Sequence, residues 1–139
     1  MPSTVFDEGL QGTLASKYTQ STALAATRVR LYTAISPTLS KDSVRANFTE
    51  VGSVMGYVTK VIGSTDFAFF LDVVNHWIIG TAVYTWVFTS GAGLTILGYY
   101  VTDTANTKAF EGEQFAAPVI IPAAGGSLQL TVSDKYKQC

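Results

Sequence analysis

Apolar side chains recur at every fourth residue near the start of the chain and at every second residue after it. The first set lies on one stripe of a helix and consists of Phe6, Leu10, Leu14 and Tyr18. An isolated helix this short is marginal in water, so its stripe must dock on the chain's own sheets or on a neighbouring subunit. We therefore predict a short N-terminal helix within an arm over residues 1–26, with Phe6, Leu10 and Leu14 as candidate partner-binding residues.

From residue 27 onward the period of two is typical of strands that present two different faces. Turns that contain glycine separate the apolar runs, and no helical pattern lies between them. We predict about eight strands, over residues 27–34, 48–51, 54–62, 67–74, 77–89, 94–101, 109–121 and 128–133. The pattern favours an all-β fold, a jelly-roll-like antiparallel β-sandwich, over a doubly wound parallel sheet. The sandwich domain spans residues 27–133, and residues 134–139 form a flexible tail.

The alternation also predicts which side chains form the core. Both faces of the run over residues 77–89 are largely apolar, so we expect this strand to be central in its sheet. Residues 27–34 instead place Arg28, Arg30 and Tyr32 on one face, which predicts a half-exposed strand. The side chains that we expect to be largely buried are Tyr84, Trp86, Phe88, Leu97 and Tyr99, the last two on one face of their strand.

Charged residues are scarce, at 14% of the chain, against roughly 25% in an average soluble domain. Residues 77–101 contain no charged side chain. A sheet without charged side chains on either face is poorly solvated when exposed. We therefore expect another subunit, or a lattice of subunits, to cover one face. The net charge of −1 argues against nucleic acid and against an anionic membrane as partners.

Two polar loops, over residues 36–46 and 103–108, hold much of the charge that the strands lack. Loops on a rigid scaffold are frequent sites of binding, and long loops in compact domains are usually functional. The candidate partner-binding residues of the first loop are Leu39, Lys41, Asp42, Val44 and Arg45. We interpret the two apolar residues as anchors and the charged ones as a rim that tunes the rate of association. The alternative is that both loops are merely solvated.

No constellation of catalytic residues stands out. His76 is the only histidine and Cys139 the only cysteine, and neither has a recognisable catalytic partner beside it. Glu111 and Glu113 lie on one face of a strand, where solvated edge carboxylates are favoured over a weak cation site. We therefore expect no catalytic, cofactor-binding or metal-binding residues, and no enzymatic activity.

The start of the chain lacks the basic region and apolar run of a signal peptide, and the longest near-apolar stretch, residues 67–88, is interrupted by polar side chains. We therefore expect the chain to be made and folded in a cytoplasm and not to span a membrane. A surface alternative remains for the aromatic residues, which can stack on sugars. The candidates are Trp77, Tyr84, Trp86, Tyr99 and Tyr100, although core packing is the favoured use of such side chains.

The order of these segments resembles small virion proteins of tailed bacteriophages, particularly head decoration or cement proteins. The resemblance covers nearly the whole chain and is carried by VFDEGLQGTL (5–14), Arg30-Leu31-Tyr32, FTEVGSVMGYV (48–58), LGYYVTD (97–103) and QFAAPVIIPAAGGSLQLTV (114–132). These are patterns of apolar and turn residues, with no catalytic residue to match. The resemblance implies a β-sandwich, often a jelly roll, that assembles as a homotrimer on a capsid.

The leading hypothesis is therefore a structural virion protein, assembled in the host cytoplasm, that decorates or cements a phage capsid by binding subunits of the major capsid protein. The alternative hypothesis is a tail-associated or fibre-associated binding module that contacts host glycans through exposed aromatic side chains. Binding of the pure protein to sugars favours the second hypothesis, and a trimer without affinity for glycans favours the first.

Overall fold

The computed structural model describes residues 4–5, 27–62, 68–72 and 77–137 of the chain. Its strands are β1 (Thr4–Val5), β2 (Thr27–Ile35), β3 (Phe48–Glu50), β4 (Lys60–Val61), β5 (Ala68–Asp72), β6 (Trp77–Phe88), β7 (Leu94–Asp103), β8 (Ala109–Ile121) and β9 (Gly126–Lys137). One short 3-10 helix, η1 (Arg45–Asn47), precedes β3. The predicted N-terminal helix, with its stripe of apolar residues, lies outside the described residues. Within the described ranges, no helix is long and apolar enough to cross a membrane.

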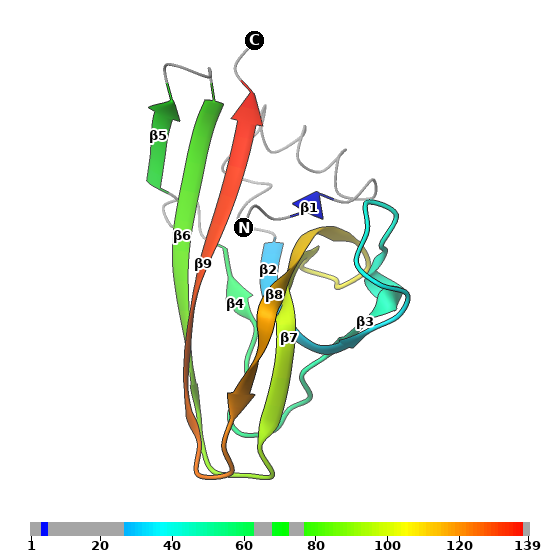
Figure 1. Ribbon diagram of the computed structural model, residues 1–139, viewed down its shortest axis with the longest axis vertical. Helices are drawn as coiled ribbons and strands as arrows, with labels where there is room; N and C mark the ends of the chain where they lie inside the picture. Colours follow the sequence, from blue (N-terminus) through cyan, green and yellow to red (C-terminus); the bar gives the residue numbers. More distant parts are fainter. Residues whose placement is uncertain (1–3, 6–26, 63–67, 73–76, 138–139) are drawn as a thin grey trace.

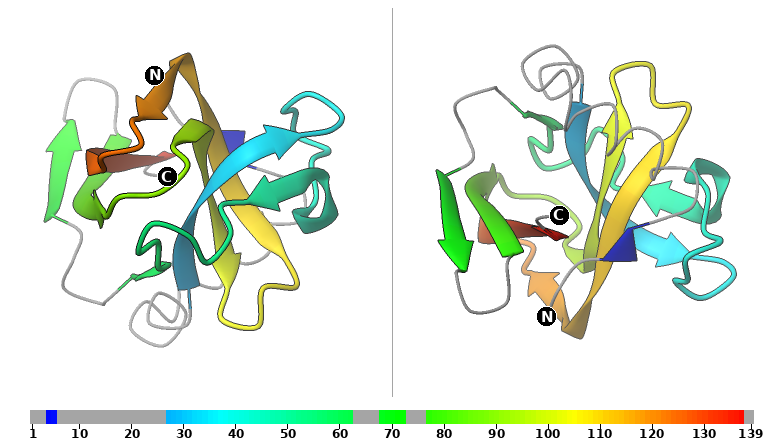
Figure 2. Two further views of the ribbon diagram at one scale, coloured as in Figure 1. Left: turned by 90° about the horizontal axis from the view of Figure 1, so that it is seen from below. Right: turned by 90° about the horizontal axis from the view of Figure 1, so that it is seen from above.

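The strands form two antiparallel sheets (Figure 1). The larger sheet, sheet A, has the order β1-β8-β7-β2-β3, with β4 also paired to β2, and the smaller sheet, sheet B, has the order β5-β6-β9. Views along the long axis show the two sheets as facing layers (Figure 2). The all-β antiparallel sandwich is confirmed, with β6 in the middle of its sheet, whereas the jelly-roll form stays a prediction.

The main core fills the space between the two sheets. Tyr84, Trp86 and Phe88 of β6 point into it and are 7%, 2% and 3% exposed, and Tyr99 of β7 is fully buried. The indole N–H of Trp86 donates a hydrogen bond of 2.8 Å to the carbonyl oxygen of Val58. Four of the five side chains that were predicted to be buried are thus confirmed in the core.

Leu97, the fifth, is half-buried on the opposite face of β7 from Tyr99. In the pairing of β7 with β8, Gly98 lies opposite Gln114 and Ile96 lies opposite Val119. Leu97 is therefore the single residue of β7 that faces residues 115–118 of β8. Such a β-bulge interrupts the alternation of the two faces. The prediction that Leu97 and Tyr99 share a face was wrong for this reason.

The middle of strand β2, residues 29–32, is buried on both faces, so this part is not half-exposed as the alternation predicted. Val29 and Leu31 face the main core, whereas Arg30 and Tyr32 point to the other side and are 8% and 0% exposed. A second cluster covers that side of sheet A and consists of Tyr32, Phe48, Tyr100 and Ala109. The prediction failed because the covering residues come from distant segments of the chain, which a local pattern does not reveal.

Two strand boundaries also differ from the predicted ones. Only Lys60–Val61 of the run over residues 54–62 is a strand, because Met55 and Gly56 turn the chain with φ angles of +54° and +76°. Strand β9 continues to Lys137 in register with β6, so residues 134–137, assigned to the tail by the sequence pattern, belong to sheet B.

Candidate partner-binding surface

The loop that carries the predicted partner-binding residues rests on the second, aromatic cluster. The rings of Phe48 and Tyr100 stack with their centroids 4.4 Å apart and their planes 8° from parallel. The ring of Tyr32 meets Phe48 edge-on at 5.0 Å. Leu39 of the loop and Leu97 of β7 pack against this cluster and are half-buried. The loop between β2 and β3 therefore has a rigid base on the outer face of sheet A.

Asparagine and serine side chains give this loop a defined shape. The side-chain amide of Asn47 donates from Nδ2 to the carbonyl oxygen of Ser36 at 3.1 Å, and its Oδ1 accepts the backbone N–H of Val44 at 2.7 Å. Ser43 is 2% exposed, and its hydroxyl accepts the backbone N–H of Ser40 at 2.9 Å. Side chains that bond to the backbone in this way stabilise turns that lack strand pairing. The polar stretch is therefore an ordered loop.

Arg45 joins this loop to the turn between β7 and β8. Its Nε donates to Oδ1 of Asn106 in that turn, and its Nη1 donates to the carbonyl oxygen of Phe48 at 3.3 Å. The guanidinium carbon lies 5.8 Å from the centroid of the Tyr100 ring, a cation–π arrangement. One side chain thus brings together the two polar loops that the sequence named separately.

The second loop is held by the carboxylate of Asp103. Its Oδ1 accepts the backbone N–H groups of Thr107, at 2.7 Å, and Lys108, at 3.2 Å, and its Oδ2 accepts the hydroxyl of Thr107. Burial acts to raise the pKa of Asp103, but these hydrogen bonds outweigh it and hold the pKa below its usual value. Residues 36–47 and 103–108 together form one surface, which we name the loop surface.

The five predicted residues of the loop surface divide into exposed and supporting ones. Lys41 and Asp42 are exposed and form an ion pair, with Nζ 3.1 Å from Oδ1. Val44 is also exposed, to 40%. Leu39 packs half-buried on the second cluster and Arg45 binds Asn106, so both support the fold. Of the two apolar residues predicted as anchors, Val44 is therefore the more accessible one, and the partner-binding role of both stays a prediction.

A buried polar network on the same side of sheet A was missed by the sequence analysis. Nη1 of Arg30 lies 3.0 and 3.2 Å from the two carboxylate oxygens of Glu50, and its Nε donates to the Thr102 hydroxyl at 2.8 Å. The Tyr57 hydroxyl donates to Glu50 at 2.9 Å and accepts the N–H of Leu31 at 3.0 Å. The only local signal was an arginine between apolar neighbours, because its partner lies 20 residues away.

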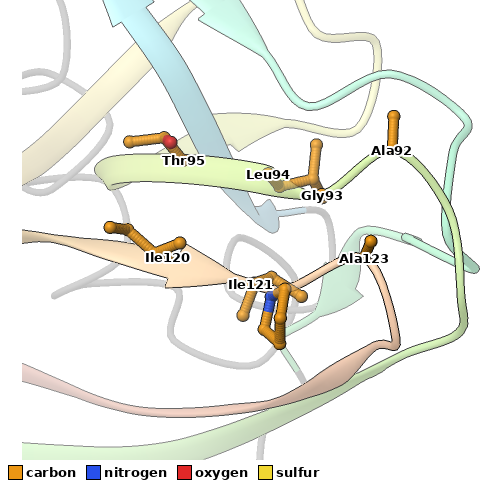
Figure 3. Close-up of a pocket in the computed structure, with 8 residues that line it drawn as sticks. Ala92, Gly93, Leu94, Thr95, Ile120, Ile121 and Ala123 are labelled. Carbon is orange, nitrogen blue, oxygen red and sulfur yellow. The ribbon is translucent and has the colours of Figure 1, made fainter.

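Outside the loop surface, the described part of the chain has two hollows, and neither gathers catalytic groups. One, of about 580 Å³, borders the Arg30–Glu50 pair, whose charges already bind each other. The other, of about 340 Å³, lies where β7 begins and β8 ends (Figure 3). Its lining carries no titratable side chain and consists of Ala92, Gly93, Leu94, Thr95, Ile120, Ile121, Pro122 and Ala123. This second hollow therefore offers no charged group to a ligand.

Burial settles the use of the aromatic residues that were considered for sugar stacking. The four that the structure describes in full are buried, and they are Tyr84, Trp86, Tyr99 and Tyr100. The side-chain surroundings of Trp77 lie outside the described part of the chain. Core packing is confirmed for these four residues, so none of the four presents an exposed ring to a sugar.

The remaining candidates for chemistry are Glu111, His76 and Cys139. Glu111 is 9% exposed, and the expectation that it is solvated was wrong, because β1 pairs with β8 at this position through Val5. Among the described residues, no group of three or more His, Cys, Asp or Glu side chains converges to hold a metal ion. His76 and Cys139 lie outside the residues that the structure describes.

A scan against protein-family models, a search of curated proteins and a search of solved structures each found no match to this chain.

Proposed function

We propose that the chain is a structural, non-enzymatic virion protein that decorates or cements a phage capsid by binding subunits of the major capsid protein. The observation that supports this proposal is the loop surface itself. Arg45 and Asn106 fix its two loops to each other, and most of its exposed side chains are polar or charged, with Val44 as its large exposed apolar side chain. A polar rim around an apolar contact is the usual anatomy of a protein–protein interface.

The order within the loop surface favours binding. A loop that is already held in shape loses little conformational entropy when it binds, so more of the contact energy contributes to affinity. Asn47 and Asp103 hold the two loops through their side-chain hydrogen bonds. In the complex, Val44 contributes a desolvated contact that slows dissociation, whereas Lys41 and Asp42 contribute mainly to the association rate and its dependence on salt.

The proposal is tested by co-sedimentation with empty capsids of the parent phage. Val44→Ser is expected to weaken capsid binding by about tenfold or more, which corresponds to about 1.4 kcal/mol. The matched control is Val58→Ser in the loop between β3 and β4, where the valine is 59% exposed but lies outside the loop surface. Leu39 is left unchanged because it packs on the second cluster.

Lys41→Glu is expected to reduce binding chiefly at low salt, because an exposed charge at a rim acts over a screened distance. Retention of the Val44→Ser protein on capsids at the level of the wild type and of the Val58→Ser control would contradict the proposed role of the loop surface. Absence of binding by the wild-type protein to these capsids would contradict the proposed function.

A further inference from the structure

Strand β9 presents a long and regular edge. It pairs with β6 over 12 residues without a bulge, and sheet B ends at β9 because no described strand pairs with its other side (Figure 1). The residues from Ser127 to Val132 contain no charge, no proline and no glycine. An edge of this kind presents N–H and C=O groups in the spacing that another strand needs.

The other edges of the sandwich carry features that oppose such pairing. On β8, β1 covers Glu111 and Gly112, and residues 115–118 bulge out of the ladder. Pro118 within that bulge has no N–H group to donate. The strands β3, β4 and β5 are 3, 2 and 5 residues long. Bulges, proline and short strands are the usual protection of sheet edges, and among the described strands β9 alone is long, regular and without them.

We propose that a second copy of this chain adds its β9 to the β9 of the first, antiparallel and about a twofold axis, so that the two copies of sheet B become one continuous sheet. Side chains from Ser127 to Val132 alternate on its two faces. Leu128, Leu130 and Val132 are at most 9% exposed and face the main core, so pairing extends one apolar layer into the other. The outward row is polar and uncharged and consists of Ser127, Gln129 and Thr131.

The lack of charge is what identifies a second copy as the partner. A foreign strand can carry a charge that complements the edge, whereas a twofold axis brings each residue near its own counterpart. Like charges directly opposite each other destabilise a strand pair, so an edge that pairs with itself must be uncharged near the axis. The neighbouring outward row of β6 continues this uncharged surface, with Val83 opposite Thr131 and Val87 opposite Ser127.

A twofold contact closes with two copies, so this interface makes a dimer and differs from the homotrimer that the resemblance to phage proteins implies. It also leaves the loop surface accessible. The second cluster beneath that surface lies on the side of sheet A that faces away from the main core, whereas β9 belongs to sheet B. The dimer does not depend on the proposed capsid binding, and either one can fail without the other.

Sedimentation equilibrium of the full chain over a wide range of concentrations tests the dimer. The wild type is expected to be in reversible monomer–dimer equilibrium, and Gln129→Lys to raise the dissociation constant by about tenfold or more. The matched control is Thr85→Lys, because Thr85 lies opposite Gln129 on β6 and is likewise exposed, but is one strand away from the edge. Thr85→Lys is expected to dimerise like the wild type.

Cysteine cross-linking gives a second measurement that does not depend on a disruptive charge. In a Cys139→Ser background, Ser127→Cys, Gln129→Cys and Thr131→Cys are each oxidised, with Thr85→Cys as the control. A covalent dimer is expected from the β9 position nearest the twofold axis and not from Thr85→Cys. The proposal is overturned by a wild type that stays monomeric, by a trimer, or by Thr85→Lys and Gln129→Lys weakening association equally, which indicates stacking of sheet faces.

Discussion

Strands β2 and β6 each run through the middle of a sheet, but they are covered differently. In β2 the side chains on both faces are buried, from Leu31 at 0% exposed on one face to Arg30 at 8% on the other. In β6 the inward Trp86 is 2% exposed, whereas its neighbour Val87 is 72% exposed. The charged side chain is thus buried and the apolar one is in water, the reverse of what residue type alone suggests.

The difference lies in what covers the outer face of each sheet. Sheet A is covered on its outer face by the chain itself, through the loop between β2 and β3 and the second cluster, and Glu50 neutralises the buried Arg30. No comparable element of the described chain covers the outward row of β6, where Val83 and Val87 are both more than half exposed. This uncharged outward row continues onto β9, whose edge we propose as the site of self-association.

The largest expected effect lies in the main core, which both sheets share. Trp86→Ala is expected to lower the free energy of unfolding by about 3–5 kcal/mol, because it removes a buried ring and the hydrogen bond to Val58. Val87→Ala, one residue away on the exposed face, is expected to change it by less than about 0.5 kcal/mol at concentrations where the chain is monomeric. Urea unfolding measures both values. Equal effects would show that β6 does not have one buried and one exposed face.

An intermediate effect is expected from the ion pair that lets sheet A bury an arginine. Glu50→Gln is expected to destabilise the fold by about 2 kcal/mol, because it leaves the largely buried guanidinium of Arg30 without its anionic partner. Lys41→Gln is the control, since its ion pair with Asp42 is exposed and is worth at most about 0.5 kcal/mol. If the two variants lose the same small free energy in urea unfolding, the Arg30–Glu50 pair does not stabilise sheet A.

Ionisation of the buried tyrosines is expected to have the smallest effect on stability at neutral pH. Its effect on the free energy of unfolding is expected to grow at alkaline pH. Burial raises the pKa of Tyr32 and of Tyr100 to about 12, and the nearby charges of Glu113 and Glu50 add to the respective shifts. Burial also raises the pKa of Tyr57. Because the folded state favours the neutral phenol, this contribution to stability is complete below pH of about 10 and is lost as the pH rises through 12.

Two measurements follow the tyrosines together. Phenolate absorbance is expected to show the buried tyrosines ionising later than the exposed ones, and urea unfolding is expected to show stability falling over the same interval of pH. A single ionisation of all seven tyrosines near their ordinary pKa, with stability unchanged, would contradict the burial of the second cluster.

Local alternation predicts the strands, the sandwich and most of the main core, because burial against the facing sheet repeats every second residue. It fails where distant segments meet. The bulge at residues 115–118 moves Leu97 to the other face, and the residues that cover Arg30 and Tyr32 come from distant segments without a periodic signal. The candidate site shows the same limit. Composition singled out both polar loops, but only the fold brings Arg45 to Asn106.

Amide hydrogen exchange at low and high protein concentration is the most direct test of the two sheets. It asks whether β9, at the edge of sheet B, gains a hydrogen-bonding partner only when two copies associate. Strand β2 is paired with β7 on one side and with β3 and β4 on the other, so its amides are expected to exchange slowly at every concentration. In β9, the amides from Ser127 to Val132 that point away from β6 are expected to exchange fast when dilute and to become protected as the concentration rises. Exchange in β9 that is as slow as in β2 and independent of concentration would show that β9 has no open edge at which a second copy binds.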